Sequence, residues 1–218
     1  MAPTELIILD FVDKFIERRS QEPLEDQNTH ASQDFLNRLM SETDDRVKIR
    51  SEILNILLAG RDTSASALAI VWFCIARYPM VCQRIRAEIE KFNGRAPELP
   101  ELQNLRYVKA VINEALRLYP IVPQNGKTAE QDTTIPRGGG ETEDLPLFVS
   151  KGDLVAWDVY SMHRRKDIYG DDAEDFRPER WLDAENEKPL RPGWAYLPFH
   201  GGPRVCIGRK FYLVLLDV

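Results

Sequence analysis

The sequence predicts a mainly α-helical protein with a minor β region. Residues 44–77 contain no proline and a single glycine, Gly60, which predicts one long helix. Short apolar runs bounded by turn residues are concentrated in residues 121–160, which favours a few short strands there. The chain has 218 residues, 43% hydrophobic and 29% charged, which suits one globular domain of moderate size or a part of a larger one.

The first half of the chain carries the helical patterns. Residues 4–19 place apolar side chains at helical spacing, and the polar residues 21–33 that follow predict a mobile loop. In the long segment, Asp44 and Asp45 can cap the N-terminal end, and Tyr78-Pro79 predicts the stop. Its second half is apolar nearly all round, so we expect burial on most sides.

Two further helices are expected at 80–92 and 105–119, followed by short strands at 147–149 and 154–157 joined by a turn. Residues 163–205 read as irregular, and Phe211 to Leu216 predicts the start of a last helix. We therefore expect residues 1–218 to form a single partial domain, divided into a helix with its polar loop (1–33), a helical part (34–120), short strands (121–160) and an irregular region ending in the last helix (161–218).

Composition excludes several classes of protein. The formal charge of −6 argues against sequence-independent nucleic-acid binding, which needs an excess of Lys and Arg to neutralise phosphates. Three widely spaced cysteines do not form a disulfide framework, and they favour a reducing compartment. No run reaches the roughly 18 uninterrupted apolar residues of a membrane span, so the expectation is a soluble chain without a transmembrane segment.

The sharpest motif is the segment FHGGPRVCIG at residues 199–208. It places Cys206 in a Gly- and Pro-rich loop just before an apolar run. A helix N-terminus lowers the pKa of a thiol, glycines let a flat cofactor approach the backbone, and free amides can donate to the sulfur. The alternative for any lone cysteine is a buried residue in a turn.

Five positions of this segment together resemble the haem-ligand signature of the cytochrome P450 haem-thiolate monooxygenases: Phe199, Gly202, Arg204, Cys206 and Gly208. The resemblance implies haem b as the cofactor with Cys206 as the axial iron ligand. It also implies that Arg204 pairs with a haem propionate, to which its fork of donors is suited, and that Phe199 packs beside the sulfur.

The same loop contains His200, which the resemblance leaves as a loop histidine. A zinc site from Cys206 and His200 fails on ligand number and spacing. The resemblance runs in order from about Asp34 to the last residue and implies a partial cytochrome P450 fold. That fold has a long central helix, a Glu-x-x-Arg helix and the cysteine haem loop.

The segment AGRDTS, residues 59–64, lies inside the long predicted helix. A helix-interior glycine costs about 1 kcal/mol relative to alanine, so Gly60 suggests a local need such as a widened or kinked turn. Taken alone, Asp-Thr pairs are mostly capping or surface residues. By resemblance to the family's oxygen-binding segment, Thr63 would steer protons to dioxygen with Asp62 as the acidic relay partner.

Glu114 and Arg117 form an i, i+3 pair that would ordinarily be a weak surface ion pair. In the family, a Glu-x-x-Arg pair joins a downstream Arg to lock the core around the haem loop. The segment FRPERW at residues 176–181 supplies that residue as Arg180, with Trp181 in place of the commoner Phe. The resemblance implies a structural role for all three charged residues.

Lys127 stands where the family usually has an Arg that reaches a haem propionate; Lys keeps the charge and loses the fork geometry. The stretches 134–140 and 160–170 resemble the fungal branch that hydroxylates alkanes and fatty acids. The resemblance therefore implies a small hydrophobic substrate, and a place on the cytosolic face of the endoplasmic reticulum membrane.

Residues 188–216 contain no acidic side chain and several basic ones. Arg209 and Lys210 predict a positive patch that docks an acidic electron donor of the NADPH-cytochrome P450 reductase type, steered by electrostatics. The alternative is a solvated face with Arg204 turned inward.

Two functions follow. The first is a monooxygenase that inserts one atom of dioxygen into a C–H bond, because thiolate ligation favours O–O cleavage. The second is a non-catalytic remnant or an incomplete gene model that at most binds haem. It rests on a length less than half that usual for the family and on an end 12 residues after Cys206. Such a chain would expose apolar helix faces and be poorly soluble.

Overall fold

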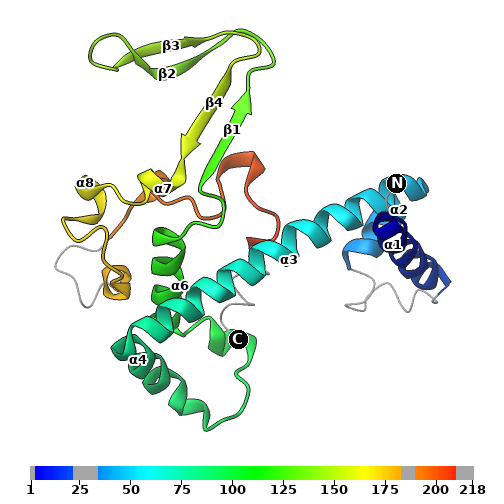
Figure 1. Ribbon diagram of the computed structural model, residues 1–218, viewed down its shortest axis with the longest axis horizontal. Helices are drawn as coiled ribbons and strands as arrows, with labels where there is room; N and C mark the ends of the chain where they lie inside the picture. The colour runs from blue at the N-terminus through cyan, green and yellow to red at the C-terminus, as the bar shows by residue number, and fades with distance from the viewer. Residues whose placement is uncertain (1–2, 22–33, 183–189, 210–218) are drawn as a thin grey trace. The chain divides into compact units, whose positions relative to one another are not determined.

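The computed structural model describes residues 3–21, 34–182 and 190–209 (Figure 1). Contacts divide the chain into two compact units, Met1–Ala65 and Ser66–Val218, which are described separately. The polar loop expected after the first helix, except for Gln21, and the helix expected at 211–216 lie outside the described residues.

The first unit consists of helices. They are α1 (Pro3–Gln21), α2 (Phe35–Glu42) and the first part of α3 (Arg46–Arg77). The α2 helix starts at Asp34, whose Oδ1 accepts the backbone N–H of Asn37 at 2.8 Å, as an N-cap carboxylate does. A small apolar core joins the three segments and comprises Val12, Ile16, Leu36, Ile49 and Ile53.

Helix α3 is a continuous α-helix of 32 residues, without a widened turn at Gly60. The predicted start is confirmed, because Asp45 Oδ1 accepts the N–H groups of Val47 at 2.9 Å and Lys48 at 3.2 Å. By length and composition alone, α3 could cross a membrane. The core helix of a soluble protein passes the same criteria, so the expectation of no transmembrane segment stays a prediction.

The expected burial of the second half of α3 on most sides is wrong. Only the stripe of Ala67, Val71 and Cys74 is buried, since those positions pack into the core around α6. Trp72 is 66% exposed and Phe73 is 52% exposed. An all-round apolar composition cannot say which faces are covered, because that depends on the neighbours present.

The helical part of the second unit is built on α6 (Arg106–Leu118), preceded by α4 (Pro79–Ile89), a 3₁₀ turn η2 (Glu90–Phe92) and α5 (Leu99–Leu102). Most of α6 is buried. Glu88, in the last turn of α4, accepts the N–H groups of Tyr107 at 3.0 Å and Val108 at 2.9 Å. A side chain of one helix thus caps the N-terminus of the next, where such donors lack intrahelical partners.

The strands form two separate antiparallel pairs. Strand β1 (Gln124–Thr128) pairs with β4 (Leu154–Asp158), and β2 (Thr133–Gly139) pairs with β3 (Leu145–Val149). The strands expected at 147–149 and 154–157 are present, with the expected turn between them. They do not pair with each other. The turn is held to the upstream chain, since Gly152 donates its N–H to the Ala129 carbonyl at 2.8 Å.

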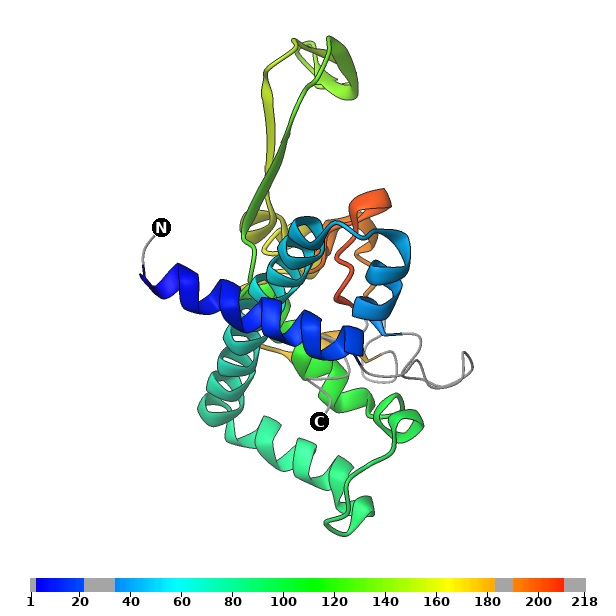
Figure 2. The ribbon, with the colours of Figure 1, turned by 90° about the vertical axis from the view of Figure 1, so that its right-hand side faces the viewer.

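Figures 1 and 2 show both strand pairs extending away from α4 and α6 as one long arm. The short helix α7 (Val159–Met162) follows β4 directly. The region expected to be irregular, residues 163–205, contains short helical turns in its described part: α8 (Lys166–Tyr169), η3 (Pro178–Trp181), η5 (Gly193–Ala195) and η6 (Gly202–Arg204). The predicted class, mainly α with a minor β region, is confirmed.

Candidate functional site

A buried ion cluster lies on α6. Glu114 and Arg117 are fully buried, and Arg180 of η3 is 3% exposed. Arg117 donates from Nε and Nη2 to the two Glu114 carboxylate oxygens at 2.9 and 2.8 Å, and Arg180 Nε donates to Glu114 Oε1 at 2.8 Å. The structure therefore brings together the three residues that the sequence grouped, in a fork geometry that only arginine offers.

The other guanidinium donors of both arginines bind mainly backbone carbonyls, and Arg180 Nη1 also contacts the Asp172 carboxylate at 3.4 Å. Arg117 Nη1 donates to the carbonyls of His163 at 2.9 Å and Ala173 at 2.6 Å. Arg180 donates to the carbonyls of Tyr169 and Asp172, each at 2.9 Å. Buried charges are tolerated only where such hydrogen bonds satisfy them. The cluster consequently fixes the path of the chain between α7 and η3.

Trp181 adds a bond that the sequence did not predict. Its indole N–H donates to Glu114 Oε2 at 2.9 Å, and the backbone N–H of Arg177 donates to Glu114 Oε1 at 2.9 Å. The Trp181 ring also lies against Tyr196, with centroids 4.7 Å apart. A phenylalanine at 181 would keep the ring contact and lose the donor.

His163 connects this cluster with the chain that leads to the cysteine. The side chain is fully buried, and its Nε2 accepts the backbone N–H of Leu197 at 2.8 Å. Burial lowers the pKa of His163 to about 4, and the positive charges of Arg117 and Arg164 act in the same direction. The imidazole is therefore neutral at pH 7. Sequence reasoning missed it, since it stands beside three basic residues that suggest a solvated turn.

The cysteine loop is closed by a backbone hydrogen bond from the N–H of Cys206 to the carbonyl of Phe199, at 3.0 Å. The Phe199 side chain is partly buried and packs against the apolar core of the unit. Gly202 has a φ of +70°, which a residue with a side chain rarely adopts. At Gly201, a Cβ would lie 2.2 Å from the ring of Trp194, so that close approach requires glycine.

The surroundings of Cys206 fit a haem. The thiol is free and exposed, and the neighbouring Val205 and Ile207 are 41% and 87% exposed, so apolar surface lies beside the sulfur. Arg204 is exposed and has no carboxylate partner among the residues that the structure describes, so its guanidinium can take a propionate. A Cβ at Gly208 would approach Cys206 Sγ to 3.8 Å.

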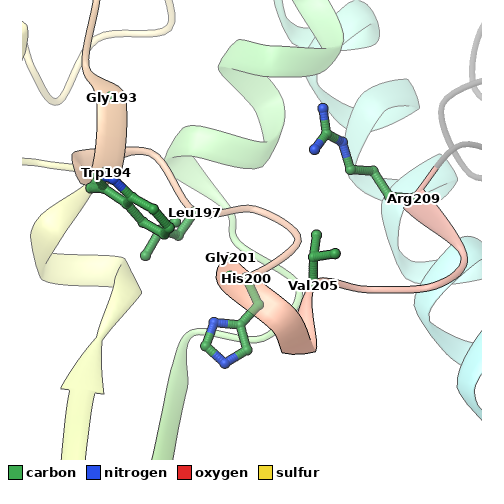
Figure 3. A pocket seen from close by; sticks show the side chains of 8 residues that line it. Gly193, Trp194, Leu197, His200, Gly201, Val205 and Arg209 are labelled. Atoms are coloured by element: carbon green, nitrogen blue, oxygen red, sulfur yellow. The ribbon is translucent and has the colours of Figure 1, made fainter.

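An open cavity of about 420 Å³ lies beside the loop (Figure 3). Its lining side chains include Trp194, Leu197, His200 and Val205, with Arg209 at one end, and the Cys206 side chain is not part of that lining. His200 has a φ of 63° and its ring lies 5.0 Å from that of Trp157 on β4, as expected of a loop histidine.

The remaining predicted residues are exposed or half-buried. Thr63 Oγ1 donates to the carbonyl of Ala59 at 2.6 Å, one turn earlier, and Asp62 forms an exposed ion pair with Arg61 at 3.0 Å. Lys127 is exposed on β1, opposite Val155.

The sequence predicts a basic patch from Arg209 and Lys210. Arg209 is exposed, and Lys210 lies outside the described residues.

Thr63 and Asp62 belong to the first unit, whereas the cysteine loop belongs to the second.

A free thiol in a tight glycine loop, braced by a buried Glu-Arg-Arg cluster, is typical of a haem-thiolate protein, and comparison with known proteins agrees. The family model for cytochrome P450 matches residues 5–215. The chain belongs to the cytochrome P450 family.

Three relatives illustrate the similarity. Cytochrome P450 monooxygenase himC of Aspergillus japonicus is 50% identical over 86% of this chain and 33% of its own length. Cytochrome P450 52A12 of Debaryomyces hansenii is 45% identical over 93% of this chain and 40% of its own length. Cytochrome P450 52A1 of Candida tropicalis is 43% identical over 95% and 39%. The chain thus spans between a third and two fifths of these relatives.

Proposed function

We propose that the protein is a haem-thiolate monooxygenase that hydroxylates a hydrophobic substrate with dioxygen and electrons from a reductase. The observation that carries the proposal is the exposed thiol of Cys206 in a loop whose entry is tied to the buried Glu114 cluster. The family membership and the names of the relatives, which include monooxygenases, support the same activity.

In this proposal Cys206 is the thiolate ligand of haem b, and Arg204 and Lys127 offer positive charges to its propionates. Gly202 and Gly208 keep the backbone beside the ligand free of side chains, and Phe199 packs next to the sulfur. When bound, a haem with a thiolate ligand supplies dioxygen activation, because the sulfur donates electron density that favours O–O cleavage.

Thr63 and Asp62 are the proposed proton path. The Thr63 hydroxyl gives its hydrogen to the Ala59 carbonyl, so its oxygen lone pairs remain available to accept a hydrogen bond from water. The Asp62 carboxylate is 69% exposed and can exchange protons with solvent. Together they would hold an ordered water and pass protons to it from the surface.

The substrate class is a long-chain alkane or fatty acid. Support comes from the segments 134–140 and 160–170, which resemble the fungal branch with that activity. By the same resemblance, we place the protein at the cytosolic face of the endoplasmic reticulum membrane.

The proposed electron donor is an acidic reductase that docks near Arg209 and Lys210. Arg209 is exposed and free to meet an acidic surface. Reversal of both charges, Arg209→Glu with Lys210→Glu, should slow haem reduction and flatten its salt dependence. An unchanged rate and an unchanged salt dependence would exclude this docking face.

The proposal is tested by the difference spectrum of the reduced chain with carbon monoxide after haem is added, beside Cys206→Ala. A red-shifted Soret band that requires Cys206 supports thiolate ligation, and hydroxylation assays with a reductase then follow. Cys74→Ala is the matched control, because that thiol is buried and burial raises its pKa to about 11. The absence of a Cys206-dependent band would favour a remnant without catalysis.

A further inference from the structure

His163 stands between the buried ion cluster and the cysteine loop. Its backbone carbonyl accepts a hydrogen bond from Arg117 Nη1 at 2.9 Å, and its backbone N–H donates to the Val159 carbonyl at 2.9 Å. Its ring reaches in the other direction and accepts the N–H of Leu197 at 2.8 Å. His163 therefore links Arg117 to Leu197, in the segment that leads into the cysteine loop.

Leu197 lies just before the position where the loop closes. Two residues later, the Phe199 carbonyl accepts the N–H of Cys206 at 3.0 Å. The neighbouring Tyr196 is held as well, because its hydroxyl donates to the Asn113 carbonyl on α6 at 3.1 Å. Its ring lies between those of His163 and Trp181, at centroid distances of 5.1 and 4.7 Å. A displacement at Leu197 would pass directly to the segment that carries the thiol.

The bond also fixes the form of the imidazole. Because Leu197 is a donor, Nε2 must carry a lone pair, and the single proton of the neutral ring is on Nδ1. His163 Nδ1 is buried and lies near the backbone carbonyls of Leu116 and Arg117, which favour a proton on the ring although neither meets strict hydrogen-bond geometry. The acceptor at Nε2 explains why an imidazole occupies this place.

We propose that His163 is a positioning residue for haem ligation: its Nε2 anchors Leu197 and thereby holds Cys206 where the thiol can bind iron. This inference rests on the proposed function for its haem-dependent part. The anchoring itself is a property of the chain without haem, so the two parts can fail separately.

The test compares His163→Gln, which keeps an acceptor oxygen near the place of Nε2, with His163→Leu, which fills similar space without one. We expect the Leu197 amide to exchange with solvent roughly tenfold faster in His163→Leu, the factor given by loss of one hydrogen bond, and to return towards wild type in His163→Gln. With haem added, the red-shifted carbon monoxide band should fall in the leucine variant and recover in the glutamine variant.

Trp181→Phe is the matched control, because it loses a buried hydrogen bond of the same cluster without touching Leu197. It should lower global stability while leaving Leu197 protected. Equal effects of the leucine and glutamine variants, or an unprotected Leu197 amide in the wild-type chain, would overturn the proposal. Exchange of the Leu197 amide in the wild-type chain tests the anchor even if a variant fails to fold. A wild-type chain with a protected Leu197 amide but no red-shifted band would remove the proposed function and leave the anchor standing.

Discussion

At the scale of single residues, Glu114 accepts five hydrogen bonds while fully shielded from water. Two guanidinium groups depend on its charge. A neutral side chain at this position would leave Arg117 without an anion, and Arg180 with only the longer contact to Asp172 Oδ1 at 3.4 Å, in a medium that solvates charge poorly. The buried pair therefore differs in kind from the exposed ion pairs elsewhere in the described residues.

We expect Glu114→Gln to lower the free energy of unfolding by about 3–5 kcal/mol, the cost of breaking a buried ion pair by removing one partner. Urea denaturation followed by tryptophan fluorescence measures this loss. Asp167→Asn is the control, since its ion pair with Arg165 is exposed and should contribute almost nothing. A loss no greater than that of the control would contradict the assigned role.

Trp181→Phe should cost about 2 kcal/mol of unfolding free energy, because it removes a hydrogen bond to a charged group and keeps the aromatic packing. Trp72→Phe serves for comparison, as that ring is 66% exposed and no hydrogen bond of its side chain is described. Indistinguishable midpoints for the two variants would show that the indole donor adds nothing.

His163 makes stability depend on pH. The pKa of the imidazole is about 4 in the folded protein and has its usual value of 6.5 in the unfolded chain. Between these two values the unfolded chain binds more protons, so stability falls as the pH decreases through this window. Denaturation midpoints at several pH values should decline less steeply for His163→Gln than for wild type. Parallel curves would mean that His163 does not contribute.

The sequence could group Glu114, Arg117 and Arg180 because their motif spacing resembles a known family. It could not show the role of His163. The run of Arg164, Arg165 and Lys166 beside His163 suggests a solvent-exposed position. The acceptor role of His163 depends on the backbone N–H of Leu197, 34 residues away. Long-range backbone contacts of this kind leave no mark on local composition.

At the scale of elements, the helix expected at 105–119 is α6 at 106–118, because its apolar face and its Tyr-Pro end are both local signals. The sequence did not predict which strands pair with each other. The runs at 147–149 and 154–157 predict strands, but alternation alone does not say which strand lies alongside. The upstream strands β1 and β2 carry Asn, Gly, Lys and Pro, which are depleted in strands and therefore weak strand signals.

Glu88→Ala should destabilise the α4–α6 pair by about 1 kcal/mol, the usual value of a helix cap, since the N–H groups of Tyr107 and Val108 lose their acceptor. Glu90→Ala, two residues along and exposed, is the control. Helix content by circular dichroism and urea midpoints report the change. A smaller effect than that of Glu90→Ala would exclude cross-helix capping.

At the scale of the whole molecule, each unit carries large exposed apolar side chains. Examples are Ile7, Phe11 and Phe15 in the first unit, and Trp72, Phe73 and Phe148 in the second. Uncovered groups of this size favour association with other apolar surfaces. The chain also spans no more than two fifths of the length of the relatives compared above. The activities of those complete proteins are therefore only proposals for this chain.

We therefore expect the 218-residue chain to self-associate at micromolar concentrations. Sedimentation velocity should show species larger than the monomer, and a variant with Trp72→Gln and Phe73→Gln should show fewer of them. Buried aromatic residues such as Phe92, which is 6% exposed, should be left unchanged because they belong to the core. A monodisperse monomer in the wild-type chain would contradict the expectation.

The hydrogen bonds from Arg117 to distant backbone carbonyls determine where the chain can accept insertions and deletions. Arg117 binds His163, 46 positions later, and the whole β arm lies in the stretch between them. Closing a longer stretch costs little, about 0.6 kcal/mol for each doubling of its length. Residues can therefore be gained or lost at the tip of the arm, between β2 and β3, while the site beneath it is preserved. That tip is where natural variation in length would be tolerated, and where a label could be inserted.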